Sequence, residues 1–361
     1  MSNSFYAIYS LRKRNVLVQS GTRKKPVSGY SDILLGGSRG LDTILTIPLL
    51  LSQGPRLQEW FRFNDVTYVS PGPIVRDLAG NFYMGNIFGI RISKLDVNGN
   101  LLEQYYPPDG TVTSYSTGGW PWGLALIGNN LYAADMLKQF IYKIDISVSP
   151  PTFTNIIGST SGVSGFSSGL VGTSSLIYGP MNMIPAGTTG LYIMQADNHV
   201  VSLYDLATTI LTTVAGGGGS NQNGYLDGTG TAALFNNPQG LFYDLSGNII
   251  VTDGGNRRIR KITLPSRVVS TIAGSGQLGS LDGPALTATF DFPKTGCCNL
   301  SNGDFYIVDG EHIIRKISNG IVSTFLGLSD GLSDVTNIAC FDNVLYISDQ
   351  SNPFVTYKIP L

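Results

Sequence analysis

Apolar residues along this chain occur in short runs that are rich in β-branched and aromatic side chains and are separated by glycine- and asparagine-rich turns. The segment 248–253, Asn-Ile-Ile-Val-Thr-Asp, is one such run and ends in a turn-forming residue. Ser246-Gly247-Asn248 and Asn302-Gly303-Asp304 supply residues that tolerate the positive φ angles of tight hairpins. Because helical periodicity is absent from the two clearest segments of this kind, the pattern predicts consecutive antiparallel strands.

Two segments repeat the same order of features. Residues 238–274 and 293–327 each begin with proline and continue through an apolar run, a Gly/Asn turn and a second apolar strand that ends in aspartate. Both then reach the sequence Ile-Arg-Lys-Ile and a strand that contains Val-Ser-Thr. Repetition of a unit of this size is the sequence signature of a repeat architecture.

The middle of the second strand recurs six times, at Tyr83, Tyr132, Tyr192, Ile250, Tyr306 and Tyr346. Three residues later stand Asn86, Asp135, Gln195, Asp253, Asp309 and Asp349, and ten to twelve residues later stand Lys94, Lys143, Leu203, Lys261, Lys316 and Lys358. A single four-stranded sheet of this length cannot bury both of its faces, whereas sheets stacked radially around an axis bury them between neighbours. The sequence therefore predicts an all-β fold, a six-bladed β-propeller.

Units four and five resemble NHL repeats. The resemblance rests on Pro238-x-Gly240, Gly247-Asn248, Asp253 with Asn256, Ile259-Arg260-Lys261-Ile262 and Thr271-Ile272-Ala273-Gly274. It is strong over residues 214–327 and fainter over the rest of 67–361. The family includes protein-binding, RNA-binding, extracellular sensor and lyase propellers, so the resemblance implies a fold and leaves the function open.

The same resemblance implies roles for two kinds of charged residue. The strand-end aspartate fixes the following turn in such repeats, which makes Asp135, Asp253, Asp309 and Asp349 structural. Arg260 and Arg315 are expected on the blade surface rather than at a ligand. Histidines bind zinc in the lyases that resemble NHL propellers, and this chain has two histidines, His199 and His312, which are too few for such a set.

The sixth unit reaches Leu361 directly after its third strand, so we expect its fourth strand to come from the N-terminal side and cover the exposed edge. Residues 43–47 are the first choice for this strand, and Gln58 to Phe63 are the alternative. We expect two parts in the chain, an N-terminal basic and aromatic arm over residues 1–40 and the propeller over residues 41–361.

Charge and aromatic content single out the arm. The chain has a net charge of −1 and only 13% charged residues, which makes a nucleic-acid partner unlikely. Residues 12–25 nevertheless carry Arg12, Lys13, Arg14, Arg23, Lys24 and Lys25, and apolar Phe5, Tyr6 and Tyr9 precede them. Aromatic residues beside basic ones are typical of protein interfaces, so we predict that the arm docks onto a protein partner. A solvated arm, a nucleic-acid arm and a hairpin on the chain's own rim are the alternatives. Trp120 and Trp122 are a second candidate contact, with a core position as their alternative.

The remaining chemistry is sparse. We find no catalytic or metal-binding motif, no phosphate loop and no nucleophile elbow, and we predict no cofactor. Cys297, Cys298 and Cys340 form neither a disulfide framework nor a zinc motif; a reducing compartment is their simplest context, and their pairing stays open. The N-terminal pattern is not that of a signal peptide, and the longest apolar run, residues 44–51, is too short to span a bilayer. These features favour an intracellular protein, or one inside a particle assembled in the cytoplasm.

The sequence therefore favours a non-catalytic protein-binding or structural scaffold propeller. Low charge and high Gly, Ser and Thr content would also suit a component of a large assembly such as a virus particle. The alternatives are a propeller enzyme, a lyase or hydrolase with a metal in its central channel, and an RNA-binding NHL-type propeller.

Overall fold

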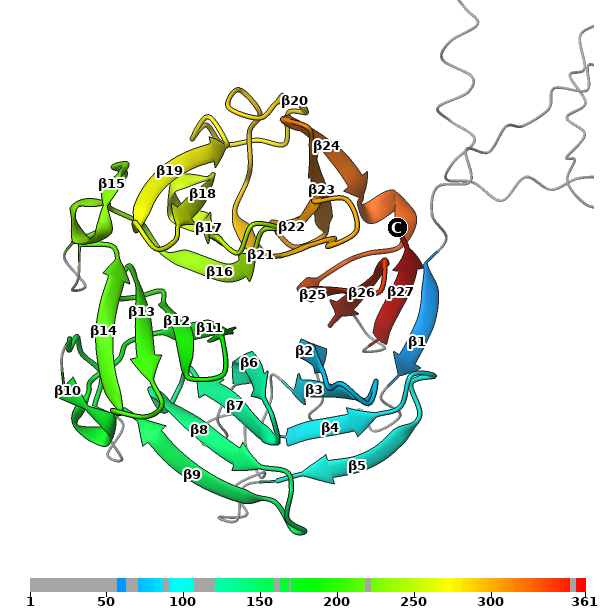
Figure 1. Cartoon of the computed structure of the whole chain (residues 1–361). Coiled ribbons are helices and arrows are strands. Elements are labelled where there is room, and N and C mark those ends of the chain that lie inside the picture. The colour runs from blue at the N-terminus through cyan, green and yellow to red at the C-terminus, as the bar shows by residue number, and fades with distance from the viewer. Residues whose placement is uncertain are drawn as a thin grey trace, which may run out of the picture. The chain divides into compact units, whose positions relative to one another are not determined.

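The computed structural model describes residues 57–62, 71–86, 91–106, 121–158, 163–168, 170–217, 222–350 and 355–361. All of these residues belong to one compact unit, Pro55–Leu361. This unit is the predicted all-β, six-bladed propeller (Figure 1). The predicted boundary at residues 40 and 41 lies outside the described residues and stays a prediction.

Each blade is an antiparallel sheet whose first three strands follow chain order outward from the axis. Blades 1 and 2 are β2 (Pro71–Arg76), β3 (Phe82–Asn86), β4 (Arg91–Leu95) and β5 (Leu101–Tyr105), then β6 (Pro121–Ile127), β7 (Asn130–Asp135), β8 (Phe140–Asp145) and β9 (Thr152–Ile157). Blade 3 is β11 (Pro180–Ala186), β12 (Gly190–Gln195), β13 (Val200–Asp205) and β14 (Ile210–Ala215), and blade 4 is β16 (Pro238–Tyr243), β17 (Ile249–Asp253), β18 (Arg258–Thr263) and β19 (Val268–Ala273). Blade 5 is β21 (Pro293–Cys298), β22 (Phe305–Asp309), β23 (Ile313–Ser318) and β24 (Ile321–Leu326).

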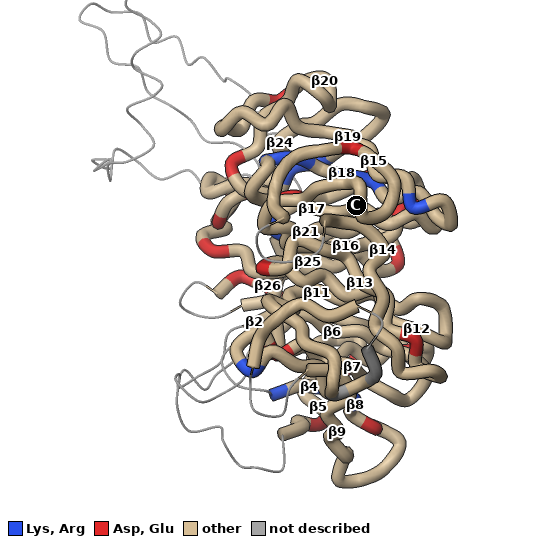
Figure 2. The backbone as a smooth tube through the Cα atoms, turned by 90° about the vertical axis from the view of Figure 1, so that its left-hand side faces the viewer, with Lys and Arg blue, Asp and Glu red and all other residues tan. Residues whose placement is uncertain are grey.

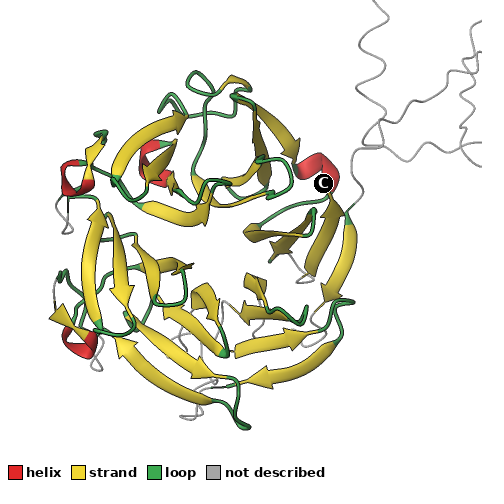
Figure 3. Ribbon diagram, in the orientation of Figure 1, coloured by secondary structure: helices red, strands yellow, loops and turns green. Residues whose placement is uncertain are grey.

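Short segments add to the outer edges of blades 3, 4 and 5. The two-residue strands β10 (Leu170–Val171), β15 (Gly228–Thr229) and β20 (Gly283–Pro284) pair with the fourth strands of these blades. The described helices are single 3₁₀ turns, η2 (Gly172–Ser174), η3 (Gly230–Ala232), η4 (Gly254–Asn256) and η5 (Leu328–Asp330) (Figure 3). In the described part of the chain, no helix is long and apolar enough to cross a membrane.

Blade 6 is closed by an N-terminal strand, as predicted. It consists of β25 (Val335–Phe341), β26 (Val344–Asp349), β27 (Val355–Pro360) and β1 (Gln58–Arg62), and β1 pairs with β27. The alternative segment therefore supplies the strand, and the first choice, residues 43–47, was wrong. Trp60 explains the outcome, because its buried ring packs 4.8 Å from Phe82 and 4.9 Å from Tyr346 and fills the junction of blades 6 and 1.

The register of the second and third strands explains the six-fold sequence pattern. Each marker lies directly opposite its later satellite, in the pairs Tyr83–Lys94, Tyr132–Lys143, Tyr192–Leu203, Ile250–Lys261, Tyr306–Lys316 and Tyr346–Lys358. The spacing of ten to twelve residues is thus the length of one hairpin. In blades 1 and 5 the lysine ammonium lies over the tyrosine ring, at 5.8 and 5.7 Å from its centroid.

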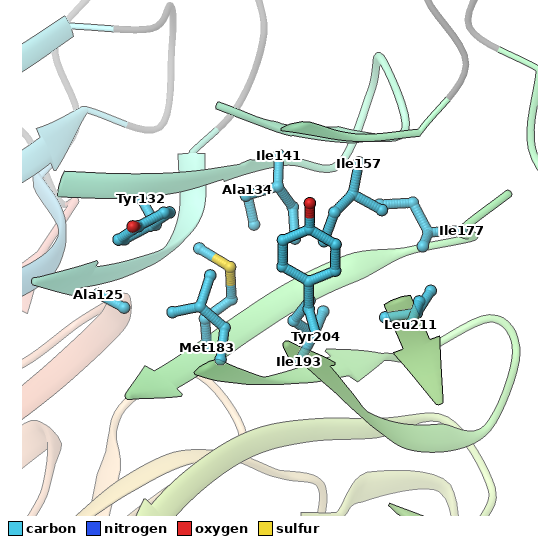
Figure 4. Packing of buried hydrophobic residues seen from close by; sticks show 11 residues of the cluster. Ala125, Tyr132, Ala134, Ile141, Ile157, Ile177, Met183, Ile193, Tyr204 and Leu211 are labelled. Carbon is cyan, nitrogen blue, oxygen red and sulfur yellow. The ribbon is translucent and has the colours of Figure 1, made fainter. Parts of the chain in front are cut away.

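The core lies between blades. Figure 4 shows the cluster in which Tyr132 and Ile141 of blade 2 face Met183 and Ile193 of blade 3. Hydroxyl groups add hydrogen bonds across these junctions, such as Thr252 Oγ1 to the carbonyl oxygen of residue 294 at 2.6 Å. Apolar stacking and such bonds together fix each blade against the next.

Two arginines expected on the surface are completely buried. The Arg260 guanidinium donates to Asp253 at 2.8 Å and to Asp227 at 2.7 Å, and Arg315 donates to Asp309 at 3.2 Å and to Asp282 at 2.8 Å. The surface prediction was wrong because a linker, which supplies Asp227 or Asp282, folds over this position of the third strand. We call each of these sets an arginine clamp.

The strand-end aspartates are structural, as predicted, although they hold different segments. Asp135 Oδ1 accepts the backbone N–H of Leu137 in the following turn. Asp309 Oδ1 accepts that of Phe292, which lies in the linker before the blade, and Asp349 also accepts backbone N–H groups from the preceding linker. These carboxylates therefore join the blades to their linkers as well as fixing turns.

Two cysteines are paired. Cys297 of β21 and Cys340 of β25 form a disulfide between blades 5 and 6, with their Cα atoms 5.8 Å apart. Cys298 is free and buried, and burial raises the pKa of its thiol to about 11. The sequence left the pairing open, and the ring decides it by placing two cysteines 43 residues apart on adjacent innermost strands. The reducing compartment stays a prediction.

Candidate functional site

A cavity of about 340 Å³ lies at one end of the central channel. The later residues of all six innermost strands line it, namely Pro73–Arg76, Leu124–Leu126, Asn182–Pro185, Leu241–Tyr243, Thr295–Cys298 and Asn337–Phe341. These residues stand at the C-terminal halves of their strands. The cavity is therefore next to the turns that join the first and second strands of the blades, which we call the inner turns.

The wall of the cavity is apolar apart from a few side chains. Its charged residue is Arg76, which forms an ion pair with Asp342 across the junction of blades 1 and 6 and lies 5.4 Å from the ring centroid of Phe82. The residues that the structure places around this cavity include no Asp, Glu or His. Carboxylate and imidazole groups are the usual protein ligands of calcium and zinc, so this wall does not offer a typical metal site.

Three inner turns carry an exposed leucine. Leu78 is fully exposed, Leu245 is 55% exposed, and Leu300, which also lines the cavity, is 68% exposed. We call these three residues the leucine rim. Each follows a side chain that accepts backbone N–H groups within its turn, with distances of 2.8 Å for Asp77 and Asp244 and 2.9 Å for Asn299. The turns therefore hold the leucines on rigid backbone at one edge of the propeller.

Only one of the predicted contact residues, Trp122, lies within the described residues. Phe5, Tyr6, Tyr9, Arg12, Lys13, Arg14, Arg23, Lys24, Lys25 and Trp120 lie outside the described residues. Trp122 is half-buried in β6 and is not among the residues that line the cavity. The structure thus leaves the docking role of the arm and of the two tryptophans as a prediction.

The two histidines lie in turns between second and third strands, as the sequence indicated. His199 Nδ1 accepts the backbone N–H of Asn237 at 3.1 Å, which links blades 3 and 4. His312 precedes β23 in blade 5, and neither histidine is a lining residue of the cavity. Within the described residues, no group of three or more His, Cys, Asp or Glu could hold a metal ion.

Two of the three basic residues of β18 are engaged within the protein. Arg260 is buried in its clamp, and the Arg258 guanidinium lies 3.8 Å from the ring centroid of Tyr225 and donates to the Ser275 carbonyl at 2.8 Å. Figure 2 shows how few charged positions occur along the ring. This arrangement gives little support to recognition of a phosphate backbone, which needs accessible Lys and Arg side chains.

Sequence reasoning missed the leucine rim. A usable signal was present, because Asp77-Leu78-Ala79-Gly80-Asn81 and Asp244-Leu245-Ser246-Gly247-Asn248 repeat one turn motif with leucine at the same position. The motif predicts a turn with an outward-facing second residue. Only the closed ring brings these turns to the mouth of one cavity.

Comparisons with known proteins show the fold and no family. No protein-family model matches the chain. Protein SUPPRESSOR OF QUENCHING 1, chloroplastic, of Arabidopsis thaliana is 34% identical over 117 residues, which are 30% of this chain and 11% of that protein. The chain thus matches only about a tenth of that relative's length, and the NHL resemblance stays a prediction.

Several solved structures share the fold of the propeller. A protein of unknown function from Bacteroides thetaiotaomicron has a TM-score of 0.56 at 18% identity, with 85% of this chain and 72% of that chain covered. A catalytically inactive virginiamycin B lyase from Staphylococcus aureus has a TM-score of 0.55 at 13% identity, with 85% of this chain and 99% of that chain covered. A gluconolactonase from Xanthomonas campestris has a TM-score of 0.53 at 11% identity, with 85% of this chain and 95% of that chain covered. At these identities the likeness shows a common six-bladed propeller alone.

Proposed function

We propose that this chain is a non-catalytic propeller that binds a partner protein at the inner-turn edge of its ring. The leucine rim carries this proposal. Burying one exposed leucine contributes roughly 1.5–3 kcal/mol, and the fixed turns reduce the entropy that binding would cost. Exposed leucines at equivalent positions of three blades thus form a favourable contact surface around the cavity.

The charges at the same edge indicate the chemistry of the partner. Asp77, Asp244 and Asp342 stand in inner turns, and the nearby cation Arg76 is already paired with Asp342. A partner that places Lys or Arg beside its apolar contact residues would complement this edge. The proposal therefore commits to a basic and apolar surface on another protein.

An enzyme is the main alternative, because the solved structures of similar fold include a lyase and a gluconolactonase. Metal-assisted chemistry in the channel would need carboxylate or imidazole ligands that converge on one point. The largely apolar wall, whose polar side chains include Asn182 and Asn337, supports binding instead. Elemental analysis of the purified protein tests the alternative, and a stoichiometric zinc or calcium ion would favour an enzyme.

The N-terminal arm is a second candidate contact for the same function. Its aromatic and basic residues led to the docking prediction, and a role within a large assembly such as a virus particle stays a hypothesis based on composition. An RNA-binding propeller is less supported, since Arg258 and Arg260 are engaged within the protein.

The experiment uses the wild-type chain, two substituted forms and one truncated form as bait for proteins from the native source. The rim variant Leu78→Ser/Leu245→Ser/Leu300→Ser should lose the partner. The matched control Leu278→Ser/Leu286→Ser/Leu328→Ser changes three exposed leucines in linkers between blades and should keep the partner. Deletion of residues 1–30 tests the arm. Equal recovery with the rim variant would contradict the proposed surface, and loss only on deletion would assign the contact to the arm.

A further inference from the structure

We infer that the channel cavity binds a small neutral molecule that carries an amide or hydroxyl group on an apolar body. This inference goes beyond the proposed protein-binding function. It concerns the interior of the cavity, whereas the protein contact concerns the rim.

The inference rests on one layer of the channel wall. The third residue of each innermost strand belongs to this layer, and the six residues are Pro73, Gly123, Asn182, Gly240, Thr295 and Asn337. Three of them, Asn182, Thr295 and Asn337, have polar side chains that line the cavity. They come from blades 3, 5 and 6, so they surround the cavity from different sides.

These three side chains have no hydrogen-bond partner within the described protein. Thr295 and Asn337 are only 7% and 8% exposed. Their polar atoms are not sealed inside the protein but open to the cavity, where a bound molecule can reach them. Because all three line the same cavity, a molecule in that cavity would satisfy them.

Several buried polar side chains of neighbouring strands, by contrast, bond within the protein. Gln195 donates to Ser202 Oγ at 2.8 Å, and Ser348 Oγ donates to the carbonyl oxygen of Gly72 at 2.9 Å. Thr336, directly before Asn337 in β25, donates to the carbonyl oxygen of Pro71 at 2.6 Å. The layer of Asn182, Thr295 and Asn337 is therefore distinct from its surroundings.

The chemistry of the wall defines the ligand class. A carboxamide both donates and accepts, and so does a hydroxyl, so the wall suits a neutral group with the same capacity. Leu124 and Leu241 and the other apolar residues suit a hydrocarbon body. A charged ligand would lose its hydration and find no free opposite charge in the wall, since Arg76 is already paired with Asp342. The volume of about 340 Å³ lies within the roughly 300–1,000 Å³ of small-molecule sites.

Three probes with one aromatic body and different polar groups test this inference at neutral pH. They are acetanilide, which is a neutral amide, benzoate, which is an anion, and benzylammonium, which is a cation. Ligand-observed NMR titration of the full chain should show saturable binding of acetanilide, and the two ions should bind at least about tenfold more weakly. Absence of saturable acetanilide binding, or equal binding of all three, would overturn the inference.

Substitutions of the layer residues test whether acetanilide binds to them. Asn182→Ala and Asn337→Leu should each weaken acetanilide binding about tenfold, the loss expected for one hydrogen bond. Leu278→Ser is the control, because its exposed side chain lies in a linker between blades and does not line the cavity, so this variant should bind acetanilide unchanged. Thermal unfolding confirms that each variant is folded. Unchanged affinity in folded Asn337→Leu would contradict the inference, and loss of the protein partner in Leu78→Ser with acetanilide binding intact would separate the two functions.

Discussion

Blades 4 and 5 hold their strand-end polar residues in a different way from blade 3. In blade 4 the buried carboxylate of Asp253 faces the guanidinium of Arg260, and blade 5 repeats this with Asp309 and Arg315. In blade 3 the corresponding side chain is Gln195, which bonds to neutral Ser202 and Asn198. One fold therefore accepts either an ion pair or a neutral hydrogen-bond set at the same position.

The clamp also binds the linker that precedes its blade. Arg260 Nη2 also donates to the Leu226 carbonyl and to Asp227, and Asp227 accepts from Thr271 Oγ1 at 3.1 Å. The linker is thereby tied to the outer strand of the blade that follows it. A buried ion pair need not add net stability, but it makes the arrangement of its surroundings more specific. The strongest repeat signal in the sequence coincides with these two clamps.

Removal of one clamp arginine should have the largest effect. Arg260→Ala leaves the buried Asp253 carboxylate without its cation, which should lower the free energy of unfolding by about 3–5 kcal/mol. Ser202→Ala in blade 3 removes one neutral hydrogen bond and should cost about 1 kcal/mol. Urea denaturation measures both. Lys261→Ala, at a half-buried neighbouring position, is the control, and an equal cost for Ser202→Ala would remove the proposed distinction.

The cost of losing an arginine should depend on pH. Burial raises the pKa of Asp253 to about 6, and the pKa of Asp309 to about 6 for the same reason, above their ordinary value of 3.8. A raised folded-state pKa means that the folded state binds the proton more tightly, so the stability from this group falls as pH rises from about 4 through 6. Without Arg260 the pKa of Asp253 rises further, since an attraction that lowers it is lost.

Arg260→Ala should therefore be less destabilising at pH 5 than at pH 8, because the protonated acid needs no cation. Arg315→Ala should show the same trend through Asp309. Ser202→Ala should show none, since Gln195 and Ser202 do not titrate. Denaturation midpoints of each variant and the wild type at the two pH values check this, and a constant difference for Arg260→Ala would contradict it.

The linker carboxylate should contribute less than the arginine. Asp227 is partly exposed, and Asp227→Asn keeps one acceptor oxygen for Arg260 or Thr271. We expect a loss of about 1 kcal/mol in the free energy of unfolding, in the range of partly exposed ion pairs. Asp282→Asn should behave alike in blade 5. A loss as large as that of Arg260→Ala would show that the linker contact, and not the buried pair, carries the clamp.

The sequence predicted the features that depend on residues close together in the chain, and it missed most of those that depend on residues far apart. The six markers are local, since strand pairing within one hairpin fixes the spacing from Tyr306 to Lys316. The burial of Arg315 was missed because it depends on Asp282, 33 residues away. The cavity could not be predicted at all, since Asn182 and Asn337 meet at one channel only when the ring closes. The sequence predicted that an N-terminal strand closes the ring, and the packing of Trp60 explains which of the two candidate segments forms it.

The smallest change in stability should come from the inner turns, where the proposed function lies. Leu78→Ser and Leu245→Ser replace exposed side chains on turns whose hydrogen bonds come from Asp77 and Asp244, so those bonds remain. Each variant should change the free energy of unfolding by no more than about 0.5 kcal/mol, as is usual for surface substitutions. The clamps thus serve stability, whereas the leucine rim is free to serve binding. Urea denaturation of the two variants checks this separation. A loss comparable to that of Arg260→Ala would mean that the leucines are part of the folded core, and the rim would then no longer be available for a partner.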